Sequence, residues 1–163
     1  IAFGSAYMYE GDLTYYGGSQ QGGACSQKYV PPGYLTVALN HNQFNNGYGC
    51  GMCLNACITN KPSGVECFKA IVDNACPECT HGDLDLGVAG DGRWHVSWST
   101  VKCPPAAPIF DVQGSNFWYL KLKVEGQGPL HSVKVNEKQA VHTPDDFWVI
   151  EDPNGELGCP PTI

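Results

Sequence analysis

Cysteine is the residue that most constrains how this chain can fold. Eight of its nine cysteines lie within residues 25 to 103, and the ninth is Cys159. In a chain of 163 residues this density indicates disulfide bonds made in an oxidising compartment, so we expect a secreted, extracellular protein. The pairing stays open, because eight cysteines allow about a hundred pairings. The eight are Cys25, Cys50, Cys53, Cys57, Cys67, Cys76, Cys79 and Cys103.

Two Cys-x-x-Cys pairs raise other interpretations, a zinc ribbon or a redox dithiol. A four-thiolate zinc site would leave the other four cysteines without a role. A thioredoxin-like dithiol precedes a long helix, whereas Cys79 is followed by the alternating segment "THGDLDLG". The five histidines form no His-Glu-x-x-His motif. We therefore favour disulfides and expect neither a metal nor a cofactor. Cys159 is left as a free thiol, an intermolecular partner, or a partner of a residue outside the chain.

The charge balance and the distribution of apolar residues disfavour several partners. Nine Lys and Arg face sixteen Asp and Glu, which gives a net charge of −7. Nucleic acid attracts a basic face, so neither it nor a strongly anionic polymer is expected as a partner. No apolar run is long enough for a membrane span. We expect a monomer whose first residue lies near the mature N-terminus.

Alternating apolar and polar residues predict a mainly β protein in two units. Between Gly-rich turns, strands are expected at residues 12–16, 34–40, 69–75, 82–87 and 94–103. A Pro-rich linker at residues 104–108 precedes strands expected at 116–126, 131–137 and 147–152. The second unit, residues 109–163, is short for an independent core, so we expect the chain to end inside that domain.

One alternating segment, Gly82 to Gly87, is the first candidate site. The strand period places Asp83 and Asp85 on one face and the two intervening leucines on the other, with the aspartate Cα atoms about 6 to 7 Å apart. Like charges this close raise the pKa of one carboxyl, which suits a general acid. For Asp83, an ordinary solvated carboxylate is the simpler interpretation.

The first predicted strand supplies a second set of candidates. Asp12, Thr14 and Tyr16 share one face of it. Tyr16 and Trp94 are candidates for walls that stack on sugar rings, whereas Trp98 is expected in the core.

A series of motifs resembles the expansin family. They are "GDLTYYGG", "GACS", "CGMC", "AIVDNACPECTHGDLDLG" and "DGRWHVSWSTVKCP", and they span residues 11 to 104. The resemblance implies a six-stranded double-psi β-barrel over residues 1–103, of the kind also found in loosenins and family 45 endoglucanases. It further implies a short helix within residues 31–44 and a small immunoglobulin-like, cellulose-binding β-sandwich over residues 109–163.

The same resemblance assigns roles to groove residues of the barrel. Thr14 and Asp85 match polar groove residues, with Asp85 the acidic group on which activity depends, and Glu78 matches the Glu after Pro. Asn74 stands where many members carry an aspartate, and Asp73 beside it would point to the opposite face of the strand.

Aromatic residues of the second unit match the family's cellulose-stacking surface. Trp118 and Tyr119 fall at its flat aromatic pair, and Phe147 or Trp148 is the candidate third residue.

The resemblance implies a function with two alternatives. We expect binding of β-1,4-glucan, chiefly cellulose or xyloglucan, and non-hydrolytic loosening of plant cell walls. The first alternative is a weak inverting endoglucanase with Asp85 as acid and Asp12 as a relocated base, because Gly17 stands where family 45 enzymes carry their base. The second is a barwin-like defence or inhibitor protein.

Overall fold

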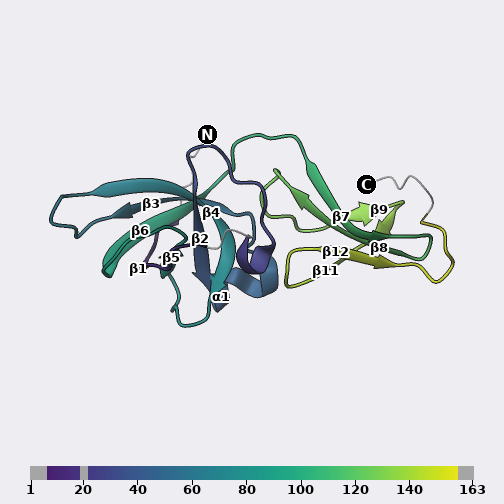
Figure 1. Ribbon diagram of the computed structural model, residues 1–163, viewed down its shortest axis with the longest axis horizontal. Coiled ribbons are helices and arrows are strands. Elements are labelled where there is room, and N and C mark those ends of the chain that lie inside the picture. The colour runs from purple at the N-terminus through teal and green to yellow at the C-terminus, as the bar shows by residue number, and fades with distance from the viewer. Residues whose placement is uncertain (1–6, 19–21, 158–163) are drawn as a thin grey trace.

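The chain forms two β-rich units placed end to end along the long axis of the molecule (Figure 1). This computed structural model describes residues 7–18 and 22–157. No helix in those two ranges is long and apolar enough to cross a membrane. The first unit contains β1 (Tyr9–Tyr15), η1 (Gly23–Cys25), β2 (Leu35–Asn40), α1 (His41–Phe44), η2 (Asn45–Gly47), β3 (Cys53–Ile58), β4 (Glu66–Cys76), β5 (Leu84–Leu86) and β6 (Trp94–Val101).

The first unit is a closed six-stranded barrel, which confirms the expected fold class. Its strands follow the order β1-β5-β2-β4-β3-β6. The pairs β1–β5 and β2–β4 are parallel, and the other four pairs are antiparallel. Inward-facing side chains fill the barrel, among them Leu13, Leu84 and Trp98, all fully buried. Trp98 also donates an indole hydrogen bond of 2.8 Å to the Gly82 carbonyl, so its one polar atom is satisfied inside the core.

The sequence predicted neither the two-residue strands at 138–139 and 141–142 nor two longer strands, and the longer two were missed for different reasons. In β3 two of the residues are the cysteines Cys53 and Cys57, and cysteine is not one of the residues typical of β-strands. In β7 (Ile109–Ser115), Ile109, Phe110 and Val112 are all exposed, so the segment shows no period-two burial. β7 is an edge strand that pairs only with β8. An edge strand has a neighbouring strand on one side only, and the alternation of its apolar and polar residues is correspondingly weak.

Four disulfides brace the barrel, as the cysteine content predicted. Cys25 pairs with Cys50, Cys53 with Cys103, Cys57 with Cys67, and Cys76 with Cys79. All four sulfurs of the two Cys-x-x-Cys pairs are therefore engaged in disulfides. Cys159 lies outside the described residues.

The second unit consists of a four-stranded sheet and a two-stranded sheet. The larger has the order β11-β12-β8-β7 and the smaller pairs β10 with β9. Their strands are β8 (Tyr119–Glu125), β9 (Lys134–Val135), β10 (Lys138–Gln139), β11 (Val141–His142) and β12 (Trp148–Glu151), besides β7. A compact core of Leu120, Leu122, Val135, Trp148 and Ile150 lies between them. The exact domain limits, including the linker at 104–108, stay a prediction.

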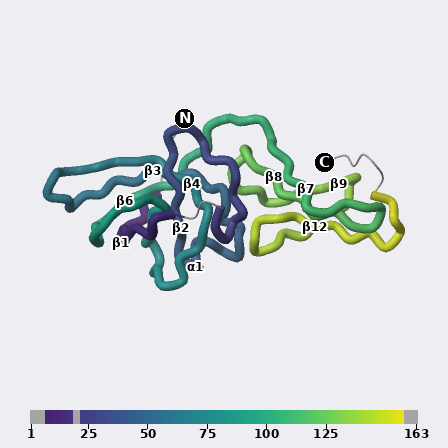
Figure 2. The backbone as a smooth tube through the Cα atoms, viewed as in Figure 1, coloured from purple at the N-terminus to yellow at the C-terminus, as the bar shows by residue number. Residues whose placement is uncertain are grey.

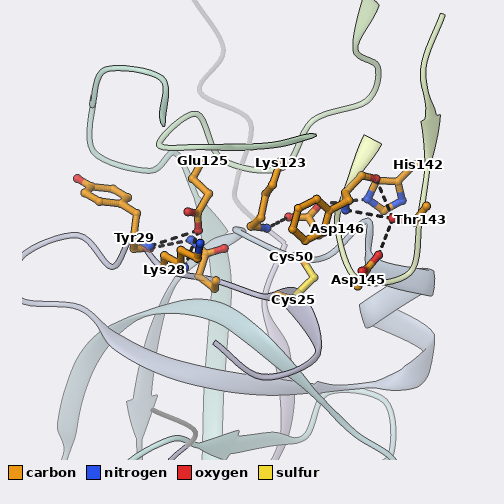
Figure 3. A network of polar contacts seen from close by, with 12 residues as sticks. Cys25, Lys28, Tyr29, Cys50, Lys123, Glu125, His142, Thr143, Asp145 and Asp146 are labelled. Atoms are coloured by element: carbon orange, nitrogen blue, oxygen red, sulfur yellow. Dashed lines mark hydrogen bonds and ion pairs between the residues drawn. A yellow bond between two sulfur atoms is a disulfide. The ribbon is translucent and has the colours of Figure 1, made fainter. Parts of the chain in front are cut away.

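Polar contacts join the two units (Figure 3). Glu125 accepts hydrogen bonds from the backbone amides of Lys28 and Tyr29, at 2.8 and 3.2 Å. The Tyr48 ring of the barrel stacks on His142 of the second unit, with ring centroids 4.1 Å apart. The tube view shows the same loops of the barrel lying against the second unit (Figure 2). The groove described next is built entirely from the barrel.

Candidate functional site

A groove on the barrel brings together six of the residues predicted from sequence. Its volume is about 260 Å³. The predicted residues that line it are Asp12, Thr14, Tyr16, Glu78, Asp83 and Asp85, and Tyr15, Cys79 and Arg93 join them. Asp73, Asn74 and Trp94, which were also expected here, do not line it. The groove is therefore made by β1, β5, the loop before β5 and the residue before β6.

Asp85 lies at the centre of the groove on β5. Its neighbours Leu84 and Leu86 are buried in the barrel core, so the strand period turns the Asp85 carboxylate to the outer face. Thr14 is its direct partner on β1 and donates a 2.8 Å hydrogen bond to Asp85 Oδ1. Burial raises the pKa of Asp85, the Thr14 bond opposes that rise, and the negative charge of Glu78 adds to it.

Asp83 braces the loop that leads into β5. One of its oxygens accepts from the Asp12 backbone amide at 2.8 Å, and the other accepts from the amide and hydroxyl of Thr80. Burial alone would raise the pKa of Asp83, but these bonds outweigh it and lower the pKa. Asp83 therefore stays ionised, and its hydrogen-bonding capacity is largely used within the protein.

Helix α1 supports the same loop from behind. Asn40 caps the helix by accepting from the Gln43 amide, and the Asn40 amide group donates to Gln43 Oε1. The same Gln43 oxygen accepts from the backbone amide of Gly82 at 3.0 Å. The short helix implied by the family resemblance thus holds the start of the Asp83–Asp85 segment in position.

Arg93 was not anticipated, although it is the sole arginine of the chain. Its guanidinium donates to Asp12 Oδ2 at 2.7 Å across the groove. The sequence signal was its place in "DGRWHV", immediately before a strand, but only the barrel closure of β1 onto β6 shows that Arg93 and Asp12 meet. Asp12 is consequently an ion-paired carboxylate.

Asp73 and Asn74 lie outside the groove lining, and β4 has a bulge at Asp73. Val37 pairs with Val72 and Ala38 with Asn74, so Asp73 is the extra residue of β4. Asp73 is 1% exposed, and burial raises its pKa to about 6. Asn74 instead accepts from the backbone amide of Ala24 at 2.8 Å and so fixes η1.

Glu78 and Asp85 approach one another beside the Cys76–Cys79 disulfide. Carboxylate oxygens of the two residues and the Cys76 sulfur all lie within 4.8 Å of one another. Because that sulfur is bonded to Cys79, the cluster offers two carboxylates and no thiolate. The disulfide closes the short loop that presents Glu78 to the groove.

Aromatic residues at the turn between β7 and β8 form an exposed aromatic surface on the second unit. Trp118 is 58% exposed and Phe117 is 53% exposed, with ring centroids 6.0 Å apart and nearly perpendicular planes. Tyr119 begins β8 and is half-buried. Phe117 was not predicted as part of this surface, because nothing in "NFWYL" distinguishes an exposed phenylalanine from a buried one.

The expectation for Phe147 and Trp148 needs correction. Phe147 is 1% exposed and Trp148 is 3% exposed, and Trp148 belongs to the core between the two sheets. Because almost none of either ring is exposed, neither can stack on an external surface.

Comparisons with known proteins find expansins by both sequence and fold. No family model matches the chain. A curated relative, Expansin-A7 of Arabidopsis thaliana, is 29% identical over 154 residues, which cover 77% of this chain. The crystal structure of the apo expansin of Clavibacter michiganensis matches with a TM-score of 0.71 at 24% identity, covering 90% of this chain and 80% of that one. The chain resembles expansins in both sequence and fold.

A second expansin structure extends that likeness. A mutant of the Clavibacter expansin in complex with cellohexaose matches with a TM-score of 0.72 at 26% identity, over the same shares of the two chains. The expansin-like chain spans 58% of the length of the Arabidopsis relative.

Proposed function

We propose that this expansin-like protein binds β-1,4-glucan in the barrel groove and loosens cellulose or xyloglucan without cutting it. The observation that carries the proposal is Asp85, held by Thr14 at the centre of an open groove on an expansin-like barrel. The Clavibacter structure with cellohexaose supports the ligand class. The four disulfides support an extracellular location.

The groove chemistry suits a sugar chain. Glucan hydroxyls donate hydrogen bonds, and the carboxylates of Asp85 and Glu78 accept them in charge-assisted form. Tyr16, on the same face of the chain as Thr14, supplies apolar ring surface beside those acceptors. Contacts of this kind would compete with the hydrogen bonds that a glucan chain makes with its neighbours in a fibre.

Ion pairing of Asp12 argues against an inverting hydrolase. An inverting enzyme needs a free carboxylate base to activate water, about 6.5 to 9.5 Å from the acid. The Asp12 carboxylate is engaged by Arg93 at 2.7 Å, so one of its oxygens is occupied by a guanidinium and is not free to hold the attacking water. A general base contributes about 100-fold to 10,000-fold to such a reaction.

One observation favours retaining hydrolysis as a second candidate. Glu78 and Asp85 carboxylate oxygens lie within 4.8 Å, near the roughly 5 to 5.5 Å carboxyl spacing of retaining glycosidases. The pKa of Asp85 is raised, as a general acid requires.

The exposed aromatic turn would anchor the protein on an insoluble fibre. Trp118 and Phe117 offer ring surface to the apolar faces of pyranose rings. We propose that a monomer combines this anchor with the groove.

A paired assay tests the proposal. Purified protein is given soluble β-glucan and xyloglucan, with new reducing ends measured, while creep of cellulose paper is measured in parallel. We expect creep without new reducing ends, and Asp85→Asn should abolish creep. Glu151→Gln, an exposed carboxylate on β12, is the matched control and should leave creep intact. Reducing ends that disappear in both Asp85→Asn and Glu78→Gln would replace loosening by retaining hydrolysis.

A further inference from the structure

A second pocket opens at the end of the barrel that lies away from the second unit. Its volume is about 280 Å³, close to the lower limit of small-molecule sites in proteins. The long hairpin between β3 and β4 forms one side of it (Figure 1), and residues 88–91 form the other. Tyr15, Phe68 and Trp94 supply aromatic wall, and Leu35, Ile58, Leu86 and Val88 supply apolar floor.

This pocket is distinct from the groove. Among the described lining residues the two share only Tyr15. Along β1 the side chains alternate, so Asp12 and Thr14 face the groove while Leu13 packs in the barrel core and Tyr15 packs against it. The pocket is therefore the open mouth of the barrel, where the core is left uncovered, and mouths of β-barrels are frequent ligand sites.

Two glycines hold the aromatic walls in place. A Cβ on Gly90 would lie 2.5 Å from the Tyr15 ring, so the loop backbone packs directly against that ring. Gly92, with φ of +87°, lies against Trp94 in the same way, and the Trp94 indole donates to the Asp91 carbonyl at 3.1 Å. Walls fixed before binding lose little conformational entropy when a ligand enters.

Charged groups at the rim limit what the pocket can hold. Lys61 is paired with Glu66 at 2.8 Å and lies 5.6 Å from the centroid of the Trp94 ring. Asp91 also lines the pocket, so the lining carries two carboxylates and one ammonium, and this excess of negative charge disfavours an anionic ligand. A neutral hydroxyl is compatible with both kinds of charged group, because it donates to a carboxylate and accepts from the ammonium. With so few polar groups the mouth suits one hydroxyl better than the many of a sugar.

We propose that the barrel mouth binds an uncharged phenol of a single ring, with the ring between Tyr15, Phe68 and Trp94 and the hydroxyl at the Lys61–Glu66 pair. The site is separate from the glucan groove and does not depend on the function proposed for it.

Binding can be followed on the whole chain by ¹H–¹⁵N NMR with 4-ethylphenol as the probe. We expect saturable shifts of the Trp94 indole signal and of the Gly90 and Gly92 amides. The methyl ether 4-ethylanisole cannot donate a hydrogen bond, and 4-ethylbenzoate is anionic. 4-Ethylanisole should bind about tenfold more weakly than the phenol, the loss expected when one hydrogen bond to a charged group is missing. 4-Ethylbenzoate should also bind more weakly, because the carboxylates of Glu66 and Asp91 repel it.

Three variants test whether 4-ethylphenol binds in this pocket rather than elsewhere on the protein. Lys61→Met should weaken 4-ethylphenol binding about tenfold. Lys69→Met is its matched control, since Lys69, on β4, also lies over an aromatic ring, that of Tyr34, but outside the pocket. Ala89→Trp should fill the mouth and abolish phenol binding while leaving cellohexaose binding unchanged.

Four results would overturn the proposal. These are unsaturable shifts centred on Trp118, equal affinity for the three aromatic probes, unchanged affinity in both Lys61→Met and Ala89→Trp, or displacement of 4-ethylphenol by cellohexaose. The last would make the mouth part of the glucan groove. A failure of cellohexaose to bind anywhere would contradict the groove proposal alone.

Discussion

Thr14 Oγ1 donates a 2.8 Å hydrogen bond to Asp85 Oδ1, although 71 residues separate the two in the chain. The parallel pairing of β1 with β5 makes Thr14 and Asp85 direct neighbours. The hydroxyl stabilises the ionised carboxylate, so this bond opposes the rise in the Asp85 pKa that burial causes.

Removing that donor should change the titration of the groove. In Thr14→Val the pKa of Asp85 is expected to rise, because burial and the charge of Glu78 then act unopposed by the hydroxyl. A ¹³C-detected carboxyl titration measures this directly. Thr100→Val, an exposed threonine on β6, provides the control and should not move it. An Asp85 pKa that is the same in both variants would show that the hydrogen bond is absent in solution.

Asp73 should make the protein more stable in mild acid than at neutral pH. Its folded pKa of about 6 exceeds its ordinary value of 3.8, so the folded state holds a proton that the unfolded state has lost. That stability is fully present below about pH 4 and is lost as the pH rises through about 6. The loss is on the order of 3 kcal/mol.

Urea denaturation between pH 4 and pH 7 checks this prediction. Asp73→Asn should flatten the decline in the free energy of unfolding, whereas Asp91→Asn, at an exposed loop position, should reproduce the wild-type slope. Identical slopes in all three proteins would mean that Asp73 titrates normally.

The disulfides should differ in what they stabilise. Cys53–Cys103 closes a separation of 50 residues and joins β3 to the end of the barrel, so the Cys53→Ala, Cys103→Ala double variant should lose about 2 to 5 kcal/mol of unfolding free energy. Cys76–Cys79 closes a separation of only 3 residues, and the corresponding double variant should lose far less. Thermal and urea unfolding measure both, and equal losses would contradict the entropic argument.

Two tryptophans of the second unit should respond in opposite ways to truncation. Trp118→Ala removes an exposed ring, so binding to insoluble cellulose should weaken while the free energy of unfolding changes by less than about 0.5 kcal/mol. Trp148→Ala empties a core position and should cost about 3 to 5 kcal/mol. Pull-down on microcrystalline cellulose beside urea unfolding separates the effects. Undiminished cellulose binding by Trp118→Ala would remove the turn from the anchor.

Local patterns were enough to predict part of the site. The segment Leu84-Asp85-Leu86 can place its leucines in the core only if Asp85 faces outward, because successive side chains of a strand alternate. The density of cysteines likewise predicted disulfides, since the number of thiols is a property of composition. These inferences needed no knowledge of which segments meet in space.

The amino-acid sequence by itself thus determined the strand faces, the disulfide-rich β class and the likeness to expansins. Tertiary structure decided which cysteines pair, that Arg93 pairs with Asp12, that Asp73 is the extra residue of a bulge in β4, and that Phe147 and Trp148 are buried rather than exposed. Each of these depends on how segments far apart in the sequence pair and pack. The alternation within one strand decides which of its residues share a face, but it does not record which distant strand that segment meets or in which register.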